Sequence, residues 1–222
     1  MSQRDLFVVV ADLDAENAVK TLLNERQEAL EIRLDFSPDR HPQGDLLRYS
    51  GRDSGCYKDA VDVLRPLLNT HRHALLIFDR DGSGAESKSR EAIENEVEQR
   101  LFGSGWTDER VAVIVIDPEL ESWVWGESPH VAAMLGWPDE RDAMRAFLES
   151  RDLWHHDERK PHDPKEAMRQ ALREKRKPTG ARLFAQLAAK VSFRDCQDEA
   201  FKKLWRRLQQ WFGVNGNQAK SG

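Results

Sequence analysis

The sequence predicts an α/β fold in which a mostly parallel sheet is flanked by helices and followed by a C-terminal helical extension. Three continuous apolar runs of strand length, Leu6–Ala11, residues 73–79 and residues 111–117, are typical of strands covered on both faces. Segments with helical spacing separate these runs, which implies right-handed crossovers and parallel pairing. After Trp123 the pattern is helical only.

The other elements follow in chain order. Asp14 is a candidate N-cap for a helix whose apolar stripe ends at Leu23, and residues 29–36 alternate like a second strand. Helical spacing returns over residues 57–69 and 88–101. Beyond Trp123, helices are predicted from "SPH", "WPDE", "DPKEAMRQALREKRK", "ARLFAQLAAKV" and "EAFKKLWRRLQQWF". The last of these has a broad apolar stripe, so we expect it to dock on the sheet.

Composition bounds the class of protein. The 222 residues are 39% hydrophobic and 33% charged, as in globular proteins, and no apolar run approaches the roughly 18–20 residues of a membrane helix. The start lacks a signal-peptide layout, so we expect a cytoplasmic protein without a membrane partner, with Cys56 and Cys196 as free thiols.

The net charge of −5 conceals an asymmetry between the two parts of the chain. Residues 151–222 hold 17 Lys/Arg and 9 Asp/Glu, a balance of +8, which leaves −13 for the first 150 residues. A basic tail beside an acidic body would suit phosphate-bearing ligands at one end and metal at the other. The alternative is an ordinary solvated face of a helix.

Acidic residues follow three of the predicted strands: Asp12, then Asp79 with Asp81, then Glu119 after Asp117. Ligand sites of parallel sheets lie beyond the carboxyl ends of the strands. Two carboxylates separated by one residue can both turn towards one Mg²⁺. Turn chemistry is the alternative for the Asp pair, and charge in a first helical turn is the alternative for Glu119.

The order of these motifs resembles a Toprim domain. "VVVADLDAENAVKTLL" is followed by "LLIFDRDG", as a strand ending in an acid and then a strand ending in Asp-x-Asp. "VIVIDPELESWVWG" is similar to a segment of Toprim-like proteins related to the overcoming-lysogenization-defect nucleases. "KPHDPKEAMRQAL" and "CQDEAFKKLWRRLQQWF" resemble the tail of the Toprim-like component of bacterial methylation-associated defence systems. Asp12-Leu13 stands where Toprim families usually carry Glu-Gly.

The resemblance implies a Toprim-like domain over residues 1–126, a docked helical extension over 127–213 and a flexible tail over 214–222. It implies Mg²⁺-dependent (or Mn²⁺-dependent) hydrolysis of nucleic acid, with DNA favoured over RNA, in antiphage defence alongside other defence-system proteins. The alternative is a non-catalytic subunit that binds nucleic acid or partner proteins. The expected metal ligands are Asp12, Asp79, Asp81 and Glu119, and Glu16 joins them in the catalytic set.

The sequence also offers basic and histidine candidates. Lys165, Arg169 and Arg173 recur about one helical turn apart, which predicts a phosphate-binding stripe, and Glu121 is expected to orient a basic partner. "HHDERKPHD" supplies His155, His156, Asp157 and His162 as conceivable zinc ligands. Adjacent histidines rarely share one metal and no Cys is nearby, so the sequence does not favour zinc there.

Overall fold

A parallel four-stranded sheet forms the centre of the protein. The computed structural model describes residues 3–123, 125, 129–190, 196 and 198–214. The strands are β1 (Arg4–Val10), β2 (Leu46–Arg48), β3 (His71–Asp79) and β4 (Val111–Ile116), in the order β2-β1-β3-β4 with every neighbouring pair parallel. The predicted α/β class is therefore confirmed. Val10 pairs with Ile77, and Asp79 pairs with Ile116, so the strands end at one common edge.

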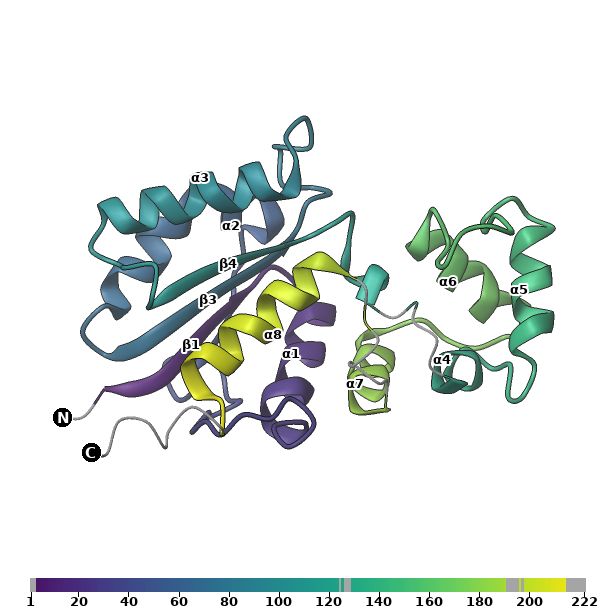
Figure 1. Ribbon diagram of the computed structural model, residues 1–222, viewed down its shortest axis with the longest axis horizontal. Coiled ribbons are helices and arrows are strands. Elements are labelled where there is room, and N and C mark those ends of the chain that lie inside the picture. Colours follow the sequence, from purple (N-terminus) through teal and green to yellow (C-terminus); the bar gives the residue numbers. More distant parts are fainter. Residues whose placement is uncertain (1–2, 124, 126–128, 191–195, 197, 215–222) are drawn as a thin grey trace.

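Helices cover both faces of the sheet (Figure 1). The helices α2 (Arg52–Leu64) and α3 (Arg90–Gly103) pack on one face. The helices α1 (Leu13–Glu25) and α8 (Glu199–Phe212) pack on the other. The remaining helices are α4 (Pro129–Met134), α5 (Arg141–Glu149), α6 (Pro164–Glu174) and α7 (Ala181–Lys190), with 3-10 turns η1 (Arg65–Leu67) and η2 (Leu120–Trp123). None of the helices among the described residues is long and apolar enough to cross a membrane.

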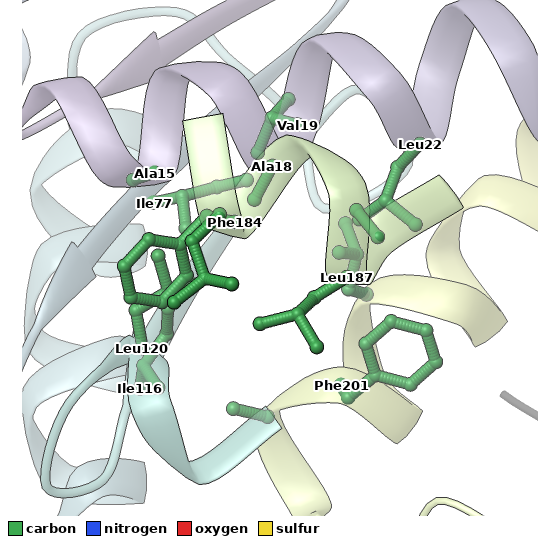
Figure 2. Packing of buried hydrophobic residues seen from close by; sticks show 14 of the residues in the cluster. Ala15, Ala18, Val19, Leu22, Ile77, Ile116, Leu120, Phe184, Leu187 and Phe201 are labelled. Atoms are coloured by element: carbon green, nitrogen blue, oxygen red, sulfur yellow. The ribbon is translucent and has the colours of Figure 1, made fainter. Parts of the chain in front are cut away.

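The continuous apolar strands serve two hydrophobic cores, because successive side chains point to opposite faces. In β1, Val8 and Val10 face α1 and α8, whereas Phe7 and Val9 face α2 and α3. Figure 2 shows the first core, where α1, α7 and α8 meet the sheet. The labelled side chains there are Ala15, Ala18, Val19, Leu22, Ile77, Ile116, Leu120, Phe184, Leu187 and Phe201.

Residues 29–36 are not the second strand, which corrects the sequence-based prediction. The expected alternation is present, since Leu30, Ile32, Leu34 and Phe36 are buried and the residues between them are exposed. Other groups satisfy the backbone: Leu34 N donates to Gln27 Oε1 (2.9 Å), and Arg33 N donates to the carbonyl of Phe212 (2.8 Å). The second strand along the chain is instead the three-residue β2, which pairs with β1 at the edge of the sheet.

Glutamates from α3 protect the edge of the sheet formed by β4. The backbone N–H groups of Val113 and Val115 donate to Glu98 Oε1 (3.0 Å) and Glu94 Oε1 (2.9 Å). Lys203 of α8 donates to both glutamates and to the carbonyl of Val113 (2.9 Å). Edge groups that would otherwise pair with another chain are therefore occupied.

Tryptophans hold the helices α4–α6 together, and in Figure 1 α5 and α6 lie beside the sheet domain rather than over it. Trp125 Nε1 donates to the carbonyl of Pro164 (2.9 Å), and Trp137 Nε1 donates to the carbonyl of Ala171 (3.1 Å). Trp125 and Trp154 pack edge to face, with ring centroids 5.5 Å apart. These contacts fix α6, which carries Lys165.

Two further expectations concern cysteines and the terminus. Cys56 is buried, Cys196 is half-buried, and both are free thiols, as predicted. Residues 215–222, most of the expected flexible tail, lie outside the described residues.

Candidate metal-binding cleft

A cleft of about 620 Å³ opens at the edge where β1 and β3 end. Six carboxylates and three cationic side chains line it. The acidic residues are Asp12, Asp14, Asp53, Asp79, Asp81 and Glu119, and the basic ones are Arg48, Arg52 and Lys165. All four predicted metal ligands therefore lie in one cleft.

The Asp-x-Asp motif enters the cleft because the chain is still extended where β3 ends. Asp79 is the last residue of the strand, and the backbone N–H of Asp81 donates to the carbonyl of Pro118 (3.1 Å). Arg80 between them donates instead to Asp117 Oδ1 (2.9 Å) and to the carbonyl of Glu86 (2.7 Å). The next residue, Gly82, has a positive φ of 81°, which lets the chain turn away.

Asp12 and Asp53 each accept a backbone hydrogen bond at the wall of the cleft. Asp12, rather than the predicted Asp14, is the N-cap of α1, and its Oδ1 accepts from Ala15 N at 2.8 Å. Asp53, in the first turn of α2, accepts from the backbone N–H of Asp79 at 2.8 Å. Asp53 therefore supports the first aspartate of the motif directly. The sequence analysis did not identify it.

Lys165 reaches the cleft from α6 and pairs with Glu119. Its Nζ lies 2.5 Å from Glu119 Oε2. Burial lowers the pKa of Lys165, but the hydrogen bond to Glu119 and the charge of Glu121 outweigh it and raise the pKa to about 12. The sequence analysis expects Glu121 to orient a basic partner, but in the structure Lys165 is hydrogen-bonded to Glu119. Its ammonium supplies a fixed positive charge at the acidic edge.

The remaining predicted site residues lie elsewhere. Glu16 does not line the cleft: its buried carboxylate accepts from Arg40 Nη2 (2.7 Å) and Lys20 Nζ (2.8 Å). Burial raises its pKa, and these two hydrogen bonds bring the pKa below its ordinary value. Glu16 is therefore not among the carboxylates that the structure gathers in the cleft, and basic side chains neutralise its charge locally.

The predicted basic stripe reaches the cleft only through its first member. Arg169 forms a two-pronged ion pair with Glu166, at 2.6 and 2.7 Å. Arg173 is exposed, and neither arginine is among the residues that line the cleft. Phosphate contact by Arg169 and Arg173 in the cleft is thus not supported by the geometry.

Negative charge is in excess in the cleft, and it shifts the pKa of several carboxyls. Burial, followed by the charges of Asp53, Asp12 and Glu121, raises the pKa of Asp79 well above its usual range. Burial and the charges of Asp12 and Asp81 also raise the pKa of Asp53 against its backbone hydrogen bonds. Both pKa shifts are those of buried carboxyls that also lie close to other negative charges.

The donor set fits a hard divalent cation, which takes oxygen ligands and keeps several waters. The carboxylates are nevertheless widely spaced. Among the described residues, no three cleft carboxylates bring ligand atoms within 4.8 Å of one another, a distance that is met by His155, Glu158 and His162. Shared direct coordination would require the cleft side chains to move closer, whereas coordination through water would not.

Glu121 makes the stability of the metal-free protein depend on pH. Burial, followed by the charge of Glu119, raises its pKa to about 7 from 4.5. The folded state therefore binds the proton more tightly than the unfolded state, and stability falls as the pH rises between these values. Removing this charge, as in Glu121→Gln, should stabilise the protein at pH 8 by on the order of 3 kcal/mol.

Denaturant unfolding in chelator at pH 5 and pH 8 measures this effect. Glu121→Gln should flatten the slope of stability against pH, and the exposed Glu174→Gln should leave it unchanged. Equal slopes in wild type and Glu121→Gln would show that Glu121 is not the titrating group.

Comparison of the chain with protein-family models, with curated proteins and with solved structures gave no match in any of the three.

Proposed function

We propose that the protein is a Toprim-like, Mg²⁺-dependent nuclease that hydrolyses phosphodiester bonds of nucleic acid, DNA rather than RNA. The observation that carries the proposal is the cleft at the carboxyl edge of the sheet, where Asp12, Asp79, Asp81 and Glu119 lie with Lys165. Acidic side chains from three strand ends at one edge are what a metal-dependent hydrolase of this topology requires.

Each group in the cleft has a role in this proposal. Asp79 and Asp81 would hold Mg²⁺ together with Asp12 and Glu119, and Mn²⁺ could replace it. When bound, the ion would polarise the phosphodiester and lower the pKa of a water molecule. Lys165, Arg48 and Arg52 supply N–H donors that can bind and orient the phosphate oxygens in the same cleft.

The biological setting of the proposal rests on sequence resemblance. The resemblance of "PELESW" and of the tail segments to a defence-associated Toprim-like family supports a role in bacterial antiphage defence, in the cytoplasm and with other defence-system proteins. The parallel α/β sheet and the placement of the Asp-x-Asp motif after β3 support the Toprim-like part of the proposal.

A second candidate is a non-catalytic subunit that binds nucleic acid or partner proteins through the same cleft. Asp12 favours it, since its carboxylate caps α1 at 2.8 Å and is one methylene shorter than the glutamate of Toprim families. The two candidates differ in whether the wild-type protein cleaves the nucleic acid that it binds.

Cleavage of end-labelled single-stranded and double-stranded DNA and RNA, with Mg²⁺ or Mn²⁺, tests the proposal. Asp81→Asn should reduce the cleavage rate by about 100-fold or more, because a metal ligand contributes several kcal/mol to the transition state. Asp117→Asn is the matched control, since this aspartate lies at the same sheet edge but pairs with Arg80 outside the cleft. Binding without cleavage of any substrate would select the non-catalytic candidate.

A further inference from the structure

A histidine-rich loop between α5 and α6 lies outside the acidic cleft. The side chains of His155, Glu158 and His162 each offer a ligand atom there, and these three atoms lie within 4.8 Å of one another. We propose that they form a binding site for a borderline divalent transition metal ion, of which Zn²⁺ is the natural representative. The site is independent of the proposed nuclease function.

The three side chains are already gathered around a common point. The rings of His155 and His162 stack with centroids 4.7 Å apart and an angle of 17° between their planes. Glu158 Oε2 lies 3.7 Å from His162 Nδ1 and accepts the backbone N–H of His155 at 3.2 Å. Two imidazoles and one carboxylate therefore face one another across a few ångströms.

Arg145 of α5 holds the backbone that carries these ligands. Its Nη2 donates to the carbonyls of His156 (2.7 Å) and Glu158 (3.2 Å), and its guanidinium lies 4.9 Å from the ring centre of Trp154. Trp154 Nε1 donates to the carbonyl of Glu158 at 2.9 Å. The loop is thus a built structure, fixed by contacts that leave the ligand side chains themselves on its outer surface.

Coordination requires a small movement of the side chains. Ligand atoms bound tetrahedrally at about 2.0–2.1 Å from Zn²⁺ are roughly 3.4 Å apart, so the present separations, which are at most 4.8 Å, must shorten by no more than about 1.4 Å. The side chains of His155, Glu158 and His162 are 52%, 35% and 38% exposed, so solvent leaves room for this movement. The group does not require two adjacent histidines to bind the same ion, because it contains His155 but not its neighbour His156.

The ligand chemistry separates this site from the cleft. Imidazole nitrogen suits Zn²⁺ and its neighbours in the first transition row, whereas carboxylates alone suit Mg²⁺. Two histidines and one glutamate are a known zinc ligand set that leaves the fourth position to water. The protein would therefore bind two classes of metal at two places, a hard cation in the cleft and a transition metal on the loop.

Untagged protein, dialysed against chelator, should be titrated with Co²⁺ while visible absorption is followed, and with Zn²⁺ in competition with a chromophoric chelator. We expect one Zn²⁺ with a Kd of about 1 µM or below. His155→Ala and His162→Ala should each weaken binding by about tenfold or more. His156→Ala is the matched control: it is 98% exposed and lies outside the group, so it should leave the affinity within about twofold.

The same titrations on Asp79→Asn separate the loop from the cleft, and the affinity should be unchanged. No Zn²⁺ binding by the wild type at micromolar concentration would overturn the proposal. So would equal weakening by His156→Ala, or loss of binding in Asp79→Asn with retention in the His155 and His162 variants. Circular dichroism of each variant confirms that the fold is intact.

Discussion

Replacing Asp79 by Asn is expected to stabilise the metal-free protein and to remove its response to Mg²⁺. The pKa of Asp79 is raised by burial and by the charges of Asp53 and Asp12, so its ionised form destabilises the folded state. Stability of the wild type should therefore fall as the pH rises above the ordinary aspartate range. At pH 8 in chelator, Asp79→Asn should gain about 1–3 kcal/mol, since an uncompensated charge of this kind costs several kcal/mol.

In Mg²⁺ the wild type should become more stable than Asp79→Asn, the reverse of their order in chelator. A cation that binds only the folded state raises the stability of the wild type, and Asp79→Asn, which lacks the ligand, should show no such rise. Thermal unfolding at pH 8, with chelator and with Mg²⁺, measures both effects. Asp117→Asn, at a half-buried ion pair outside the cleft, should change stability by less than about 1 kcal/mol and keep the Mg²⁺ response. A destabilised Asp79→Asn that still responds to Mg²⁺ would mean that Asp79 has a structural role.

Replacing Lys203 by Met is expected to destabilise the protein by about 3–5 kcal/mol, because removing one partner leaves buried charge uncompensated. Lys203 Nζ lies 2.8 Å from Glu98 and 3.2 Å from Glu94, and both glutamates are buried against β4. Burial already raises the pKa of Glu94, and the charge of Lys203 opposes that rise. Denaturant unfolding at pH 7 measures the loss.

The neighbouring Lys202→Met is the control for a lysine on the same helix. Lys202 pairs with Glu199 near the surface, at 2.9 Å, so its loss should cost less than about 1 kcal/mol. Adding Glu98→Gln to Lys203→Met should restore part of the lost stability, since it removes the stranded charge. Equal small losses for both lysines would show that Lys203 does not hold the edge of the sheet.

The strands with continuous apolar sequence were predictable, and the short or irregular elements were not. β1, β3 and β4 are covered on both faces over residues 6–10, 74–78 and 111–116, so these stretches are continuously apolar. Residues 29–36 alternate because they are buried on one side, but Gln27 and Phe212 satisfy their backbone where a strand partner would otherwise be needed. β2 has three residues, too few to show the alternation of apolar and polar residues that predicts a strand.

In the site, the sequence predicted the residues that directly follow strands. It did not predict residues that only the packing of a helix brings into the cleft. Asp12, Asp79, Asp81 and Glu119 were found because strand ends meet at one edge. Asp53 comes from the first turn of a helix, and only the docking of α2 places it beside Asp79. The pairing of Arg169 with Glu166 could have been predicted from the sequence, since residues three apart lie side by side on a helix.

Calorimetric titration of the chelator-treated protein with Mg²⁺ and with Mn²⁺ tests most directly whether the cleft binds metal. Wild type and Asp117→Asn should bind, His162→Ala should bind Mg²⁺ as the wild type does, and Asp79→Ala combined with Asp81→Ala should not. Absence of binding by the wild type, or binding that survives in the double variant, would contradict the assignment of the cleft as a metal site.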